Sequence, residues 1–283
     1  MNGLVSLALC SIMWSFGGIF LKNVEWNGIA ISGMRSLIGG LFMCLVLRKH
    51  IRVKGSSLKQ TVYLWAGAVC YALTMIFFVA ANKLTTAANA ILLQYTSPLY
   101  IILLGPFILS ERNRTSDYVT VAGVMGGIVL FFADGLETGN MTGNLLAAAS
   151  GITYALASIM FRKSPEVSSD AMMLSHFITA LVTVPWMVTS GMPQCRSWIF
   201  LGLAGIVAIG IPSILYTHGL KTVRALTASF ITMFEPLMNP VWVMVFAGEV
   251  PSAKCIAGGF MILGFIALRS VIQSRSAVLH RGE

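Results

Sequence analysis

Two long apolar stretches that resemble each other decide the fold of this chain. Residues 82–111 read NKLTTAANAILLQYTSPLYIILLGPFILSE, and residues 220–249 read LKTVRALTASFITMFEPLMNPVWVMVFAGE. At a constant offset of 138 residues, Ala87 aligns with Ala225, Pro98 with Pro236 and Glu111 with Glu249. Runs of about 25 such residues are long enough to cross the roughly 30 Å hydrocarbon layer of a bilayer as tilted helices. A repeated membrane helix with a proline near its middle is typical of transporters.

The composition agrees with a membrane protein. Of 283 residues, 57% are hydrophobic and 10% are charged, whereas soluble domains carry roughly 25% charged residues. The mean hydropathy is +0.82. The net charge of +9 does not indicate nucleic-acid binding, because the cations occur in short clusters between apolar runs. The five cysteines lie mostly within apolar spans and lack metal-ligand spacing. We therefore expect them to pack in the interior, and a disulfide between Cys195 and Cys255 is left as an alternative.

Ten spans are predicted, and we expect an all-α integral membrane protein. Breaks marked by Gly, Pro, Asn, Ser or charge separate apolar runs at 2–21, 27–48, 59–81, 84–109, 115–133, 140–161, 170–190, 196–218, 222–247 and 252–273. If the N-terminus is cytoplasmic, the inside loops and tail hold fourteen Lys and Arg and the outside loops hold four, with Arg35 inside a span. This bias predicts both termini in the cytoplasm of a multi-pass protein of the cell (plasma or inner) membrane.

The repeat offset contains five spans, an odd number, so two copies must cross the membrane in opposite directions. We therefore expect two inverted five-helix repeats, residues 1–139 and 140–283. Other matches between the halves are Tyr71 with Ile209 and Phe78 with Tyr216 at the same offset, Trp14 with Tyr154 and Lys22 with Arg162 at an offset of 140 and, after a further one-residue gap, Arg35 with His176. Inverted repeats place a binding site near the membrane midplane, between the halves.

These residues resemble a known family. Residues 11–18 (SIMWSFGG) with Lys22 and Arg35, together with the two stretches quoted above, are similar to EamA-type members of the drug/metabolite transporter superfamily. The resemblance covers the whole chain. It implies a ten-helix basket whose central cavity is lined by the first, third, fourth, sixth, eighth and ninth helices, and it implies efflux of amino acids or related small metabolites. The first half departs from symmetry by carrying Ser97 where the second carries Glu235.

Glu235 is the sharpest single signal in the sequence. It falls near mid-membrane, where an ionised carboxylate costs several kcal/mol unless it is paired or faces water. We predict that it couples transport to protons or binds a cationic group; the alternative is a permanent pair with Arg35 or a helix terminus. Helical spacing places Thr227, Ile231, Glu235 and Trp242 on one face, opposite Asn89, Leu93, Ser97 and Leu104 on the matching helix.

Prolines and aromatic residues extend the predicted site. Pro98, Pro236 and Pro240 each free a backbone carbonyl, which is tolerated where it lines a cavity, although a kink for packing alone is the alternative. By analogy with the family, the predicted lining aromatics are Trp14, Tyr71, Phe78, Tyr154 and Tyr216. Their faces attract cations, but Trp and Tyr also populate membrane interfaces.

Arg35, Glu111 and Glu249 each allow two interpretations, while the histidines and glycines have simpler ones. Arg35 either binds a substrate carboxylate or, as we favour here, ties helices together with Glu235. Glu111 and Glu249 are expected at helix ends, as interfacial anchors or in gate ion pairs with Arg112 or Lys254. His176 and His218 lack an i, i+4 partner, which argues against a metal site. Glycines such as Gly123, Gly127 and Gly258 indicate close helix packing, in a hairpin or at a dimer face.

The sequence therefore predicts a secondary transporter of small organic solutes that works by alternating access and exports amino acids or related metabolites. A proton-coupled carrier of organic cations is the alternative, and a channel a weaker one. An enzyme is not expected, because we find no cluster of His, Asp or Ser with His at a membrane face. We expect no cofactor or metal; the partners are a small-molecule substrate, the lipid bilayer and protons as coupling ion, and the chain is a monomer or homodimer.

Overall fold

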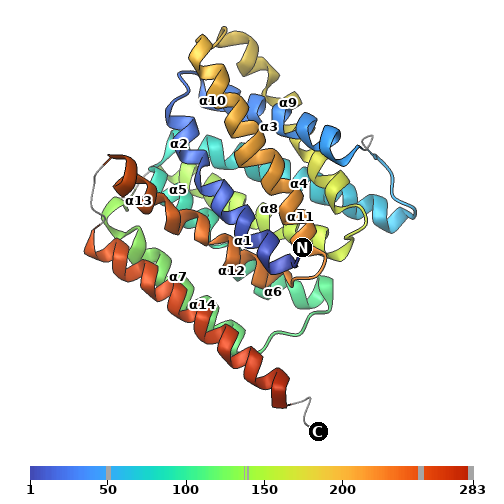
Figure 1. The fold of residues 1–283 in the computed structure, drawn as a ribbon, viewed down its shortest axis with the longest axis vertical. Coiled ribbons are helices and arrows are strands. Elements are labelled where there is room, and N and C mark those ends of the chain that lie inside the picture. The colour runs from blue at the N-terminus through green and yellow to red at the C-terminus, as the bar shows by residue number, and fades with distance from the viewer. Residues whose placement is uncertain (49–51, 137, 139, 248–251, 280–283) are drawn as a thin grey trace.

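The computed structural model describes residues 1–48, 52–136, 138, 140–247 and 252–279 (Figure 1). Within these ranges every regular element is a helix. The elements in chain order are α1 (Gly3–Ser15), α2 (Gly17–Lys22), α3 (Gly28–Leu47), α4 (Leu58–Leu84), α5 (Ala87–Gln94), α6 (Ser97–Leu109), α7 (Thr115–Phe131), η1 (Ala133–Gly135), α8 (Met141–Lys163), α9 (Ser168–Thr189), α10 (Cys195–Gly205), η2 (Ile206–Gly210), α11 (Ile211–Leu220), α12 (Ala225–Thr232), α13 (Phe234–Ala247) and α14 (Ala253–Leu279).

The ten predicted spans are confirmed, with several of them built from two consecutive helices. α1 continues into α2, α5 into α6, α10 through η2 into α11, and α12 into α13. Eight helical segments are long and apolar enough to cross a membrane, while Thr115–Phe131 and Ala225–Met238 are shorter apolar segments. The chain is an all-helical, multi-pass membrane protein. Sequence patterning located these helices because apolar runs of membrane length were separated by short polar breaks.

Polar residues at the breaks begin the helices. The side chains of Asn2, Asn27, Ser57, Thr86 and Asn140 each accept a hydrogen bond from a backbone N–H in the first turn of the helix that follows. Such caps satisfy donors that have no partner within the helix, and each contributes about 1 kcal/mol. These polar residues therefore fix where the five helices α1, α3, α4, α5 and α8 start.

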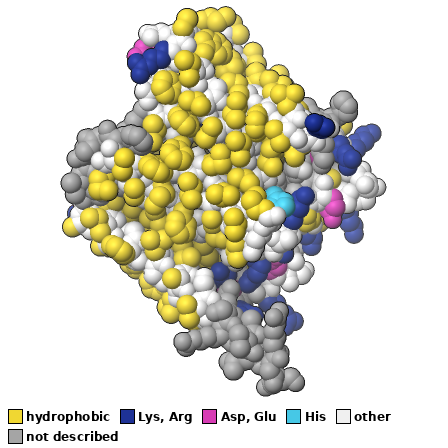
Figure 2. Space-filling view, viewed as in Figure 1, with side chains coloured by type: hydrophobic (Ala, Val, Ile, Leu, Met, Phe, Trp, Pro, Cys, Tyr) yellow, Lys and Arg dark blue, Asp and Glu magenta, His cyan; other side chains and the backbone are white. Residues whose placement is uncertain are grey.

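The outer surface is apolar, as lipid requires. Hydrophobic side chains cover most of the face shown in Figure 2, and Lys and Arg gather toward its edges. Phe107, Leu45 and Phe260 are 86%, 76% and 73% exposed, respectively. Side chains this large and this exposed are compatible with hydrocarbon as their solvent, and an apolar surface so extensive would be unusual on a soluble monomer.

Glycines set the closest approach between helices. α14 runs alongside α7 at one edge of the bundle (Figure 1), and a Cβ atom added at Gly258 would lie 2.4 Å from the backbone nitrogen of Phe131. A Cβ added at Gly127 would lie 2.7 Å from the side chain of Ile262. These glycines pack α7 against α14, two helices that are not consecutive in the chain, whereas the sequence suggested a hairpin or a dimer face.

Two helices break at equivalent positions of the repeated stretch. α5 ends at Gln94 and α6 begins at Ser97, while α12 ends at Thr232 and α13 begins at Phe234. The bounds of α5 and α12, Ala87–Gln94 and Ala225–Thr232, differ by the 138-residue offset at both ends. Each break comes just before a proline, because the proline ring cannot donate to the carbonyl four residues earlier. The predicted effect of Pro98 and Pro236 is therefore seen as an interruption of the helix over one or two residues.

Candidate functional site

A cavity of about 440 Å³ lies between the two halves of the chain. Its walls come from α1 and α2, α3, α4, α5 and α6, α8, η2, and α12 and α13. The cavity thus uses all the spans implied by the resemblance, and α3 in addition. The π-helical turn η2 contributes Ala208 and Ile209; such turns are frequent at functional sites.

The cavity extends toward one end of the helix bundle and stops at mid-depth toward the other. Asn82 and Lys83, at the end of α4, line it and are exposed. On the first span the lining begins only at Trp14, and on α4 only at Tyr71. The preceding halves of both helices contribute nothing to the wall, so the cavity has a mouth and a floor.

Most of the predicted site residues lie in the cavity wall. The wall includes Trp14, Arg35, Tyr71, Phe78, Ser97, Tyr154, Glu235 and Pro236. It also includes polar residues that the sequence did not single out, namely Ser32, Thr74, Asn82, Lys83, Gln94, Tyr95 and Thr232. Four of these (Asn82, Lys83, Gln94 and Tyr95) are in or beside the quoted first stretch, but nothing in helical spacing distinguishes them from their neighbours.

Four predicted binding residues lie outside the wall. Asn89 donates to Thr85 and Asn144 at 3.3 Å each. Thr227 accepts a hydrogen bond from Arg269 at 3.2 Å.

The other two support the wall from behind. Tyr216 shares a 2.7 Å hydrogen bond with Ser158, and Trp242 donates to Ser15 at 2.9 Å. Pro98 is buried at the start of α6 and does not line the cavity, and the side chain of Pro240 lies outside the described residues.

Glu235 faces the cavity from the first turn of α13. The hydroxyl of Tyr95 donates to its Oε2 atom at 2.9 Å. The N-terminus of a helix favours a negative charge through its free N–H groups. Across the ranges that the structure describes, no ion pair joins Glu235 to Arg35 or to another cation. The carboxylate is therefore stabilised by a helix end and a phenol rather than by a permanent salt bridge.

The carbonyl freed by Pro236 has a defined partner. Thr232 lies four residues before this proline, and its carbonyl oxygen accepts a hydrogen bond from the Ser11 hydroxyl at 3.1 Å. Ser11 belongs to α1, so the bond joins the first half of the chain to the break between α12 and α13. Substitution of a side-chain donor for the missing backbone N–H keeps the break stable away from water.

Aromatic rings pack together at the floor of the cavity, with Trp14, Tyr71 and Tyr154 in its wall and Tyr216 behind them. The ring centroids of Trp14 and Tyr216 are 5.3 Å apart, those of Tyr154 and Tyr216 are 6.1 Å apart, and those of Tyr71 and Tyr154 are 6.4 Å apart. These separations are typical of interacting aromatic pairs. The rings come from α1, α4, α8 and α11, so the floor joins both halves.

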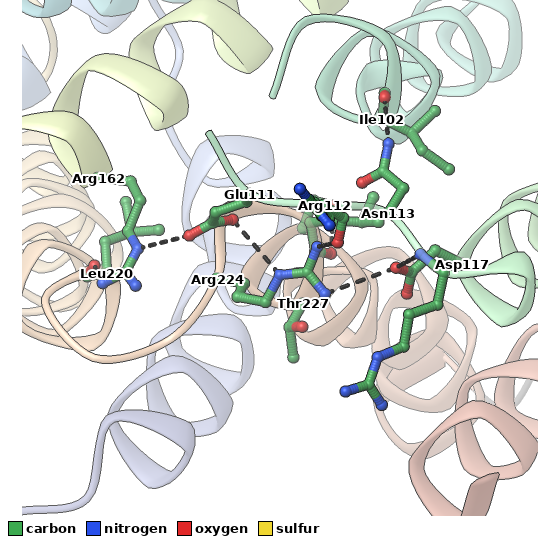
Figure 3. A network of polar contacts seen from close by, with 12 residues as sticks. Ile102, Glu111, Arg112, Asn113, Asp117, Arg162, Leu220, Arg224 and Thr227 are labelled. Carbon is green, nitrogen blue, oxygen red and sulfur yellow. Dashed lines mark hydrogen bonds and ion pairs between the residues drawn. The ribbon is translucent and has the colours of Figure 1, made fainter. Parts of the chain in front are cut away.

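An ion-pair network lies beyond the floor, at the closed end (Figure 3). Glu111, which follows α6, accepts from Arg162 Nε at 3.1 Å and lies 3.5 Å from Arg224 Nε. Arg162 also donates to the carbonyl oxygens of Leu220 and Lys221 at 3.1 and 2.7 Å. The expected pair between Glu111 and Arg112 is wrong: Arg112 contributes its carbonyl, which accepts from Arg224 at 3.0 Å.

The network continues into a buried ion pair. Asp117, on α7, is fully buried; it accepts from Arg269 of α14 at 2.7 Å and lies 3.5 Å from Arg224. At the other end of the same two helices, Lys254 pairs with Asp134 at 2.6 Å. Glu249, for which a pair with Lys254 was expected, lies outside the described residues. Sequence reasoning missed Asp117 and Arg269, although charges so close to apolar spans are a signal for such a pair.

Comparison with known proteins identifies a family of membrane transporters and a solved structure with the same fold. The sequence profile of the EamA-like transporter family matches the chain twice, over residues 1–133 and 141–271. The pseudopaline exporter CntI of Pseudomonas aeruginosa is 26% identical, over 93% of each chain. The aromatic amino acid exporter YddG of Ancylobacter novellus is 24% identical, over 70% of this chain and 72% of its own. A solved crystal structure shares the fold with a TM-score of 0.81 at 20% identity, covering 96% of this chain and 98% of that one.

Proposed function

Because this chain belongs to the EamA-like transporter family, we propose that it exports small organic solutes, amino acids or related metabolites, by alternating access. The observation that carries the proposal is a cavity between the two halves that has a mouth at one end, a closed floor, and Glu235 in its wall. Two relatives are an aromatic amino acid exporter and an exporter of pseudopaline, which favours cargo with amino-acid chemistry.

The packing of the two halves supports alternating access. We propose that residues 1–139 and 140–283 form inverted repeats. Under the sequence offset, the packed pair of α4 with α8 corresponds to the packed pair of α11 with α1, and α3 with α9 and α7 with α14 are pairs of counterparts. A dyad in the membrane plane would make the mouth and the floor exchange roles when the halves rock against each other.

The charge pattern suggests which side is which. The closed end carries Arg112, Arg162, Arg224 and Arg269 in one network. Cytoplasmic ends of membrane proteins carry an excess of Lys and Arg. We therefore assign the closed end and both termini to the cytoplasm, with the mouth of the cavity toward the outside.

Glu235 is the proposed coupling residue. It lies in the cavity wall with a single hydrogen bond from Tyr95 among the contacts of the described chain, so a proton or a cationic group of the cargo can reach it. A carboxylate that alternately binds a proton and a cargo would exchange one for the other. Transport should then depend on pH through this one group.

The test is counterflow in proteoliposomes. Purified protein should exchange external labelled solute for internal unlabelled solute, which a channel does not do; bound solute without exchange would refute transport. Exchange by Glu235→Gln should lose the pH dependence of the wild-type protein. The control is Glu166→Gln, an exposed glutamate between α8 and α9, which should keep it. A Glu235→Gln variant with the wild-type rate and pH profile would exclude coupling through this residue.

A further inference from the structure

One side of the cavity wall carries polar atoms with no partner. Over the part of the chain that the structure describes, Arg35 Nε and Ser32 Oγ are buried and make no hydrogen bond. Both residues line the cavity. They are three residues apart on α3, so their side chains project from the same face of the helix. Arg35 also makes no ion pair with a residue in these ranges.

An unpaired guanidinium at this depth is costly. Arginine within membrane segments pairs with another charge, with carbonyls or with water, and leaving a buried donor without a partner costs about 1–3 kcal/mol or more. The guanidinium groups of the network at the closed end, those of Arg162, Arg224 and Arg269, all have acidic or carbonyl partners. Arg35 differs from them because, among the described residues, its Nε atom has no hydrogen-bond partner and its side chain lines the cavity.

The preferred partner of this pair of groups is a carboxylate. A guanidinium presents N–H donors in a planar fork that matches the two oxygens of a carboxylate, and a neighbouring hydroxyl can add a third bond. The ring wall beside the fork comes from Tyr71 and Phe78 of α4. The side chain of Glu235 enters the same cavity from the other half of the chain, and Lys83 lies at the mouth, so Arg35 and Glu235 are the two charged groups below the mouth.

We propose that Arg35 and Ser32 form a subsite for the carboxylate of the transported solute, with the rest of the cargo lying against the aromatic wall. This inference rests on the proposed function and narrows the cargo to carboxylates, with an ammonium group accommodated toward Glu235. It reverses the role that the sequence favoured for Arg35, which was a tie to Glu235.

The experiment compares each acid with its neutral amide. The probes are L-phenylalanine and L-phenylalaninamide, L-leucine and L-leucinamide, and 3-phenylpropionate and 3-phenylpropionamide, with binding to the purified full chain measured by titration calorimetry. Wild-type protein should bind at least one acid about 10- to 100-fold more tightly than its amide, the effect of a charge-assisted hydrogen bond. Arg35→Gln should remove this preference and leave binding of the amide within about threefold.

Two further variants keep the result interpretable if Arg35→Gln is unstable. Arg35→Lys keeps the positive charge but loses the planar set of guanidinium donors, so it should retain only part of the preference for the acid over its amide. Ser32→Ala removes one hydroxyl and should weaken binding of the acid by about fivefold. The control Arg196→Gln changes an exposed arginine on α10 and should bind like wild type.

The outcomes separate the subsite from the proposed function. No binding of any of the acids to wild type, or an Arg35→Gln variant that keeps the preference for the acid, would overturn the subsite. Equal losses for acid and amide would also overturn it, because Arg35 would then hold the fold rather than the cargo. Selective binding of an acid that is never exchanged in counterflow would uphold the subsite and refute transport.

Discussion

The ion pairs of Glu111 should hold the floor end of the cavity closed, and Glu111→Gln tests this. The substitution keeps the shape and the acceptor oxygen but removes the charge that Arg162 and Arg224 share. Glu111 follows α6 in the first half, and both arginines belong to the second half. If the halves separate at this end during transport, the pairs exist only in the closed state, and their loss shifts the equilibrium toward the state open at this end.

The structure sets the size of the shift. The side chains of Glu111, Arg162 and Arg224 are 20%, 23% and 29% exposed, so water screens the two pairs in part. Pairs of this kind contribute about 0.2–1 kcal/mol each. Loss of both changes the free energy by about 0.5–2 kcal/mol, which raises the ratio of open to closed molecules by about 2- to 30-fold.

A native cysteine reports the opening. Cys10 is fully buried and lies one helical turn before Trp14 on the same face of α1, on the closed side of the floor. In a variant whose other four cysteines are alanine, the rate of Cys10 alkylation by N-ethylmaleimide should follow the open population. The rate should rise about 2- to 30-fold in Glu111→Gln.

A matched ion pair at the other end provides the control. Asp134→Asn breaks the pair with Lys254, which joins the ends of α7 and α14 and does not cross the cavity. Cys10 should then react at its original rate. An unchanged rate in Glu111→Gln, or an equal increase in both variants, would show that the Glu111 pairs do not close this end.

The remaining predictions concern stability. Asp117→Asn should destabilise the protein by about 3–5 kcal/mol, because it leaves the 4%-exposed Arg269 without its buried counter-charge; a thermal transition like that of wild type would contradict this. Gly258→Ala should cost about 1–3 kcal/mol, since its added Cβ would meet the backbone of α7. Gly264→Ala, on the same helix and with nothing within 4 Å of the added atom, should be neutral or slightly stabilising. Thermal unfolding of the three variants, measured together in one detergent, checks both predictions.

The helices were predictable from sequence because their signal is long and local. An apolar run as long as residues 84–109 is stable only as a membrane-spanning helix. The capping residue Thr86 marks where this helix begins. Glu235 was predictable as a cavity residue for the same reason, because an acidic group in an apolar run is costly anywhere else. These inferences use only the neighbours of each residue along the chain.

Side-chain directions were not predictable across the helix breaks. Thr227 was placed on the face of Glu235 by counting two helical turns, but α12 ends at Thr232 and α13 begins at Phe234. Helical counting loses accuracy across such a junction, since Met233 between the two helices, with φ −67° and ψ −10°, departs from ideal α-helical angles. The same applies to Asn89 and Ser97, which lie on either side of the break between α5 and α6. The proline predicted a kink in the helix. The interruption of the helix also changes which side chains face the cavity, and the proline alone did not predict this change.

The partners of charged groups were also not predictable from sequence, because they come from distant parts of the chain. Arg112 is the neighbour of Glu111 in sequence, yet Arg162 and Arg224 reach Glu111 from residues far along the chain. Tyr95, the hydrogen-bond partner of Glu235, is 140 residues away from it. A sequence offers no local signal for pairs of this kind, so their identity required the packed structure.

The two halves are similar in their helices but different in the charges they bring to the cavity. The counterpart of Glu235 is Ser97, which lines the cavity without a charge. The counterpart of Arg35 is His176, which is fully buried and bonds Ser213 at 2.9 Å. The first half therefore supplies the cations of the cavity wall, Arg35 and Lys83, and the second half supplies its anion, Glu235. The inverted repeats that we propose would allow the cavity to open to either side, whereas the unequal charges would allow it to hold a polar cargo in one orientation. Substituting the charge of one half should thus change which solutes bind while leaving the exchange between the two open states in place.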